Sequence, residues 1–360
     1  MKKIVGIIAA VAMATSVFAA DASAKVVMTS NLFKYDAGTK KVDVFGVAEG
    51  NQGWNPLLSL SVSGDKAGAT VKFYDVKDAS GENNGDTRAD GWQIWFKPAD
   101  ILKVTVGQFA TNLNQETIDY SHTDSGIDKF GFALSLTPVD GLSFDLFFRS
   151  NLGSQYDNPL FWLSKEDGKD AKVGDVYFKA AYGADFGTIS AMFRYGDSMD
   201  SKKMMFGAGY SGSVDSVSYF VNVLGYMNDG FAGLRVEPFV KANIDSVGIS
   251  AFIPVTYVGT GTKMFSADGS NWRVANIGYS GAPKDGKVFL GTTLKVTFPM
   301  GPLCGYVYVK ENDWTAENFS VIVKPGFTVN VGSCAIDFAI EATIQEKMAL
   351  SVPVVFSVAW

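Results

Sequence analysis

Large apolar side chains occupy every second position at the C-terminal end of this chain. In an extended strand successive side chains point to opposite faces, so this two-residue period predicts a strand with one apolar face. The positions in between carry mostly small or polar residues. An apolar strand face must be covered by a second sheet or by lipid. The alternating apolar residues are Leu350, Val352, Val354, Phe356, Val358 and Trp360.

The same alternation recurs along the whole chain. It is clear in the segments 130–137, 175–182, 247–256 and 336–345. Segments of about 10 residues have the length of a tilted membrane-spanning strand. No linker, low-complexity tract or change of composition interrupts the pattern. We therefore predict an all-β fold in which residues 25–360 form a single domain.

Short and long connections alternate between these segments, which is the layout of a transmembrane antiparallel β-barrel with short periplasmic turns and long extracellular loops. We count about 18 strands, with about 16 as the alternative, and place the first strand over 42–50. An even count puts both chain ends at the periplasmic side. The expected turns lie near 64–68, 98–100, 138–141, 185–187, 212–215, 245–246, 299–302 and 332–333. The expected loops are 78–90, 110–126, 151–173, 197–201, 227–231, 260–286 and 312–318.

A secreted β-sandwich or β-solenoid would share the alternation. Neither fold explains the rhythm of short and long connections. Each would also leave wide apolar faces that need a second sheet to cover them. The pattern therefore favours the barrel.

The N-terminal segment is typical of a secretory signal peptide. Lys2 and Lys3 precede a short apolar stretch over residues 4–18, and two small-residue cleavage sequences follow, ending at Ala19 and Ala24. We favour cleavage after Ala24, which makes residues 1–24 the signal peptide, with Ala19 as the alternative. Beyond it no run reaches the roughly 18 apolar residues of a membrane-spanning helix.

The signal peptide, the amphipathic strands and the aromatic C-terminus together resemble those of Gram-negative-type outer-membrane β-barrel proteins of the porin class. In that family the terminal strand is the recognition signal for the assembly machinery, and it usually ends in Phe rather than Trp. The resemblance assigns this signal to Val354, Phe356, Val358 and Trp360. It implies a cell outer membrane location, with the lipid bilayer, the assembly machinery and periplasmic chaperones as partners. A homotrimer, frequent among general porins, is left open.

If the apolar residues face lipid, the alternate residues face the lumen. A charge on the lipid face costs about 2–4 kcal/mol at the bilayer midplane, so charged strand residues belong in water or in pairs. We expect three arginines to form one side of a constriction and to face Asp145 and Glu237. The expected pore-lining and constriction residues are Asp145, Arg149, Arg194, Arg235, Glu237 and Lys241. Further lumen charges are expected at Lys287, Lys295, Asp337 and Glu341.

A barrel of about 18 strands stays open unless something fills it. The loops 110–126 and 151–173 are the candidates to fold inward. Cys304 and Cys334 are expected on opposite faces of strands that are not neighbours, which disfavours a disulfide between them.

No catalytic or metal-binding motif stands out. The one histidine, His122, lies in an expected loop, and we expect no enzyme activity, metal or cofactor. The net charge of −6 argues against nucleic acid as a partner. The pattern indicates a porin-like channel for passive diffusion of ions and small hydrophilic solutes. The alternatives are a surface adhesin or structural protein, and a specific transporter of apolar solutes, which would need an apolar lumen.

Overall fold

The structure is a computed structural model. It describes residues 21–47, 57–77, 83–118, 127–149, 163–164, 172–173, 176–196, 203–228, 230–259, 286, 288–311, 314–315 and 320–359. For some strand residues, Arg149 among them, only the backbone is described. Among the residues described, no helix is long and apolar enough to cross a bilayer.

All regular structure in the described part of the chain is β-strand. The first strands are β1 (Asp21–Asp36), β2 (Lys41–Val47), β3 (Leu57–Ser63), β4 (Ala67–Lys77), β5 (Asn83–Ala99), β6 (Leu102–Thr111), β7 (Ile127–Val139), β8 (Leu142–Arg149), β9 (Leu163–Ser164), β10 (Lys172–Val173), β11 (Val176–Ala184) and β12 (Gly187–Gly196). The others are β13 (Lys203–Val214), β14 (Val217–Asn228), β15 (Phe231–Ile244), β16 (Val247–Phe252), β17 (Val255–Val258), β18 (Val288–Leu290), β19 (Thr292–Met300), β20 (Leu303–Glu311), β21 (Val321–Val331), β22 (Cys334–Ala339), β23 (Glu341–Ile344) and β24 (Ala349–Ala359).

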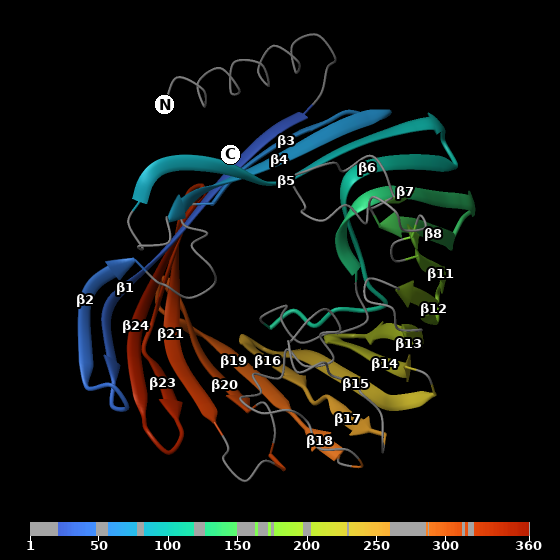
Figure 1. Cartoon of the computed structure of the whole chain (residues 1–360). Helices are drawn as coiled ribbons and strands as arrows, with labels where there is room; N and C mark the ends of the chain where they lie inside the picture. The colour runs from blue at the N-terminus through green and yellow to red at the C-terminus, as the bar shows by residue number, and fades with distance from the viewer. Residues whose placement is uncertain are drawn as a thin grey trace.

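The strands form one closed antiparallel barrel (Figure 1). The sheet contains 22 strand segments, and β24 pairs with β1 to close it, from Lys25↔Ala359 to Asp36↔Ala349. Some wall positions are filled by two consecutive segments, namely β2/β3, β16/β17, β18/β19 and β22/β23. The wall therefore has 18 strand positions, which confirms the predicted fold class and strand number.

The connections follow the predicted rhythm. The short turns join β3 to β4, β5 to β6, β7 to β8, β11 to β12, β13 to β14, β15 to β16, β19 to β20 and β21 to β22, as expected. Asp215 and Asp245 adopt φ values of 50° and 53° in two of these turns, a conformation that Asp tolerates better than most residues. One loop is shorter than expected, because β5 begins at Asn83 and most of segment 78–90 belongs to the wall.

The position predicted for the first strand was wrong. The wall begins with β1, and the segment expected as the first strand instead contributes β2, which shares the second wall position with β3. A register shift between Asn31 and Lys34 hides β1 in the sequence. Such a bulge adds a residue and reverses the side-chain alternation beyond it. A search for an unbroken two-residue period therefore misses this strand.

The two faces of the wall differ in the way the alternation predicts. Outward-facing Phe178, Phe193 and Phe206 lie in one row across β11, β12 and β13 and are 40%, 40% and 47% exposed. Inward-facing Phe147 and Tyr177 are fully buried. A belt of exposed apolar side chains around a closed barrel is the surface that lipid covers in a transmembrane barrel.

Candidate functional site

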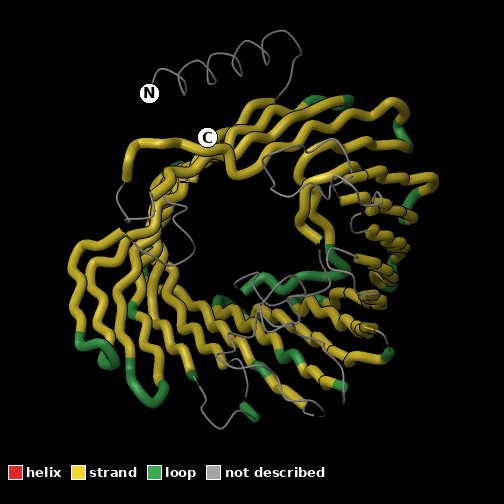
Figure 2. The backbone as a smooth tube through the Cα atoms, in the orientation of Figure 1, coloured by secondary structure: helices red, strands yellow, loops and turns green. Residues whose placement is uncertain are grey.

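Part of the loop after β6 folds into the barrel. This inward loop, residues 112–118, lies inside the ring of strands, where Figure 2 shows it in green. Leu113 is 5% exposed and clusters with Met192 and Leu224 of the wall. Ile118, 8% exposed, packs against three wall residues. These are Phe220, Phe239 and Phe252. Of the two loops predicted as candidates, 110–126 thus turns inward in its described part, while 151–173 lies mostly outside the described residues.

Two features of β6 and its neighbours turn the chain inward. Gly107 has a φ of +103°, a value that only glycine adopts readily, and the pairing of β6 with β5 reaches no further than Gln93↔Gly107. Beyond this point the ladders of the described residues pair β6 with β7 and not with β5. A local hydrogen bond then stabilises the inward loop, because the buried Glu116 carboxylate accepts from the Ile118 backbone N–H at 2.5 Å.

The inward loop is held to the wall by a buried polar network. The Asn114 side chain donates to Asn222 Oδ1 at 2.9 Å, and Asn222 Nδ2 donates back to the Asn114 carbonyl at 2.9 Å. Asn222 Nδ2 also donates to Glu237 Oε2 at 2.9 Å, and Arg235 Nε donates to Glu237 Oε1 at 2.8 Å. Asn222 and Glu237 are 0% exposed and Arg235 is 2% exposed. We call these four residues the Asn222 network.

Two glycines of β13 provide room for the loop. A Cβ on Gly207 would lie 3.0 Å from Leu113 Cδ1, and a Cβ on Gly209 would lie 2.7 Å from Asn114 Nδ2. Both distances are shorter than ordinary contacts, so side chains at these two positions would collide with Leu113 and Asn114 of the loop. Small residues at successive inward positions were a signal for a packed loop that the sequence analysis did not use.

Asp145 and Arg149 lie on β8, and Arg194 lies on β12, with β11 between these two strands. Asp145 accepts hydrogen bonds from Ser135 Oγ at 2.5 Å and Thr111 Oγ1 at 3.4 Å. The Arg194 backbone pairs with Tyr177 and Met205, and Arg194 is 9% exposed. The Arg149 backbone ends β8, and its side chain lies outside the described part. Asp145 thus shares the wall of the arginines and does not lie across the lumen from them.

Arg235 and Glu237 meet side by side on β15 and not across the lumen. Their Nε–Oε1 distance is 2.8 Å, and Asn222 connects Glu237 to Asn114 of the inward loop. Lys241 lies further along β15, exposed, in register with Ser218 and Ser250. The role of these residues in a constriction stays a prediction.

A second group of polar side chains lines the wall from β19 to β23. Tyr306 donates to Asp337 Oδ1 at 2.8 Å, and Thr328 donates to Asp337 Oδ2 at 2.9 Å. Lys295 Nζ lies 4.8 Å from the centre of the Tyr306 ring. Lys324 and Glu341 form a half-exposed ion pair at 3.4 Å. Phasing by apolar residues predicted Lys295, Asp337 and Glu341 on this face, and Lys287 lies outside the described residues.

Cations outnumber carboxylates on the described inward face of β4 to β23. The cations are Lys72, Lys97, Lys103, Lys179, Arg194, Arg235, Lys241, Lys295, Lys310 and Lys324. The carboxylates are Asp145, Glu237, Asp337 and Glu341.

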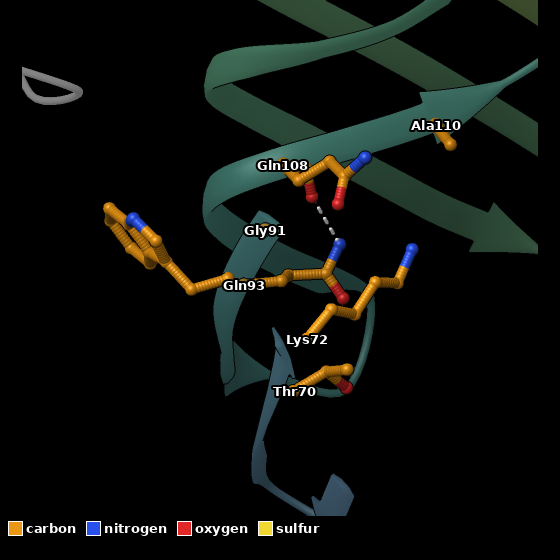
Figure 3. A pocket seen from close by; sticks show the side chains of 7 residues that line it. Thr70, Lys72, Gly91, Gln93, Gln108 and Ala110 are labelled. Atoms are coloured by element: carbon orange, nitrogen blue, oxygen red, sulfur yellow. Dashed lines mark hydrogen bonds between the residues drawn. The ribbon is translucent and has the colours of Figure 1, made fainter. Parts of the chain in front are cut away.

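A small recess lies where β6 departs from β5 (Figure 3). Its volume is about 180 Å³, and Thr70, Lys72, Gln93 and Gln108 supply most of its polar lining. Gln93 Nε2 donates to the Gln108 carbonyl at 2.6 Å. The recess therefore offers hydrogen-bond donors, acceptors and one positive charge.

The described residues hold no group of three His, Cys, Asp or Glu side chains that could bind a metal ion. Cys304 and Cys334 are both free and exposed. Their strands β20 and β22 are separated by β21. His122 lies outside the described residues.

The residues assigned to the assembly signal lie on the closing strand. Phe356 pairs with Met28 of β1 and Ile336 of β22, and Val354 and Val358 flank it in the same two ladders. Trp360 lies outside the described residues.

No protein-family model and no curated protein matches the chain. Similar solved structures include Pseudomonas aeruginosa OpdQ, with 10% identity, a TM-score of 0.57 and coverage of 95% of this chain and 98% of that one. The outer membrane protein OpdK of the same organism has 12% identity, a TM-score of 0.58 and coverage of 94% and 99%. OpdK with vanillate has 13% identity, a TM-score of 0.56 and the same coverage of 94% and 99%. The chain therefore has the fold of these Pseudomonas aeruginosa proteins, a closed transmembrane β-barrel.

Proposed function

We propose that the chain forms an outer-membrane channel for passive diffusion of ions and small hydrophilic solutes, narrowed by the inward loop. The observation that carries this proposal is the closed barrel of 18 strand positions with charged residues along its inner wall. Barrels of about 16–18 strands are wide enough for an aqueous channel, whereas side chains fill a barrel of about 8. A polar lumen disfavours the alternative of a channel for apolar solutes.

The channel prefers anions in this proposal. Lysine and arginine side chains outnumber carboxylates on the described inner wall, and a lumen of one predominant sign concentrates ions of the opposite sign. One structure of similar fold was solved with vanillate, an organic anion. We extend the proposal to small organic anions among the solutes.

In this proposal the inward loop forms one side of the constriction, and the part of the inner wall that the loop does not contact forms the other side. Among the sequence-predicted residues whose side chains are described, Lys241 is exposed and Asp145 is half-buried, whereas Arg194 is buried. Arg235 and Glu237 support the loop through Asn222. We further propose that the strand ending in Val354, Phe356 and Val358 is the assembly signal.

Single-channel recording of the refolded chain in a planar bilayer tests the function. Discrete, steady openings are expected, and the reversal potential in a potassium chloride gradient should have the sign of chloride preference. A folded barrel that stays electrically silent would refute the channel. A cation-selective current would keep the channel and refute the anion preference.

A further inference from the structure

We infer that Asn222 positions the inward loop and thereby sets the cross-section of the pore. The inference rests on the proposed channel function for its consequence, but the position of the loop can be measured without any current. It begins from the contrast between two kinds of contact under the loop.

Apolar contacts hold the loop without fixing its place. Leu113 and Ile118 bury their side chains against separate clusters on the wall. Burial of apolar area is favourable but non-directional, so these contacts alone would tolerate a shift of the loop along the wall. A pore with a defined cross-section needs a directional contact in addition.

Asn222 supplies this contact from the middle of β14. Its carbonyl oxygen accepts from the Asn114 side chain, and its amide group donates both to the Asn114 backbone and to Glu237. The two amide hydrogens and the oxygen of one carboxamide are therefore all used. The exchange of hydrogen bonds in both directions with Asn114 specifies one register of loop and wall.

A buried ion pair on the wall fixes the orientation of Asn222. Arg235 and Glu237 are 2% and 0% exposed, and burial of both charges is unfavourable unless their polar atoms find partners. Asn222 satisfies Glu237 Oε2 while Arg235 satisfies Oε1. The same carboxamide bonds both this carboxylate and Asn114 of the loop, so the wall presents it to the loop in one orientation. Asn222 thus links the position of the loop to the buried ion pair.

The experiment measures solvent access to the loop in the full-length barrel. Cys304 and Cys334 are replaced by Ser, because both are exposed, and Leu113→Cys is added as a probe for a charged, water-soluble thiol reagent. Asn222→Asp keeps the shape of the side chain but removes both donors and sets a carboxylate against Glu237. Loss of these bonds should raise the labelling rate by about 5- to 30-fold.

Asn330→Asp is the matched control. Asn330 faces inward on β21 in register with Ala335 and is exposed, so this variant adds the same charge to the lumen away from the loop. It should label at the parent rate. Equal labelling of the Asn222→Asp and parent barrels would overturn the inference.

Two further measurements keep the outcome clear. If Asn222→Asp does not fold, Asn114→Ala changes only the loop side of the network, and unchanged labelling in that variant would also overturn the inference. In bilayers the Asn222→Asp channel should conduct more than the Asn330→Asp channel and admit larger neutral solutes. Silence of the parent barrel would refute the channel function but leave the labelling result valid for the position of the loop.

Discussion

The substitution Gly209→Ala tests whether the wall is shaped for the inward loop. Gly209 lies on β13 in register with Ser190 and Asn222. An added Cβ would lie 2.7 Å from Asn114 Nδ2, 2.8 Å from Asn222 Oδ1 and 2.9 Å from Ser190 Oγ. Real Cβ atoms do not approach other heavy atoms so closely. The methyl group must therefore separate Asn114 from Asn222.

The size of the effect follows from overpacking at a site that has little room to adjust. An extra methyl group in a packed site costs about 1–3 kcal/mol, which lowers the ratio of docked to undocked loop by about 5- to 150-fold. The strand itself gains, because Ala in place of Gly stabilises regular structure by about 0.5–1 kcal/mol. The substitution should thus weaken the docking of the loop and stabilise the strand of the wall.

Single-channel conductance and chemical unfolding in lipid vesicles separate these two responses. We expect the Gly209→Ala channel to have a higher conductance or unsteady openings. The barrel should resist urea at least as well as the parent barrel. Gly183→Ala on β11 is the control, because its Cβ would have no neighbour closer than 3.4 Å. A Gly209→Ala channel with the parent conductance and steady openings would refute the idea that this position makes room for the loop.

Three further predictions address the wall. Val223 faces outward near the middle of β14, and its side chain is 41% exposed. Val223→Lys should lower the free energy of unfolding in lipid by about 2–4 kcal/mol, whereas Asn330→Lys on the inner face should change it little. Equal effects would contradict the assignment of faces. Reaction of Cys304 with a charged thiol reagent should alter the channel current, because Cys304 pairs with the inward Thr328. Reaction of Cys334 should not, because Cys334 pairs with the outward Val358. A current that responds to Cys334 alone would show that the inner and outer faces are assigned the wrong way round. Intact-mass analysis of the exported protein should show cleavage after Ala19 and not after Ala24, because residues 21–24 pair with β3 in the wall. A mature chain that starts at Lys25 would show that the barrel closes without these pairs.

The architecture could be predicted because its signals are local. The alternation around Phe178 and Ile249 fixes the phase of a strand, and the turns at Asp215 and Asp245 carry residues that tolerate positive φ. The same phase placed Lys295, Asp337 and Glu341 on the inner wall. Where a bulge breaks the period, as in β1, the strand could not be predicted, because the spacing of two residues does not continue across it.

The candidate site could not be predicted to the same depth, because it depends on contacts between segments far apart in the chain. Asn114 and Asn222 are unremarkable polar residues until the loop brings them together. Arg235 was expected to face Asp145 and Glu237 from the other side of a constriction. A spacing of two residues on one strand instead places Arg235 and Glu237 side by side, within reach of each other. The glycines at 207 and 209 carry the clearest local sign of a packed loop, since successive inward positions without side chains leave space that another segment can fill.

The net charge of the chain is a poor guide to selectivity, because charges of opposite sign occupy different parts of the barrel. The chain carries a net charge of −6, yet its described inner wall is predominantly cationic, and turn residues such as Asp185, Asp215 and Asp245 lie at the ends of strands. Only charges along the lumen act on a permeating ion at short range. Salt should therefore weaken the preference, since the Debye length falls from about 10 Å at 0.1 M to about 3 Å at 1 M. We expect the anion-to-cation permeability ratio, measured from reversal potentials at a fixed concentration ratio, to fall towards the free-solution value as total salt rises. A ratio that stays constant over this range would show that wall charge does not set the selectivity.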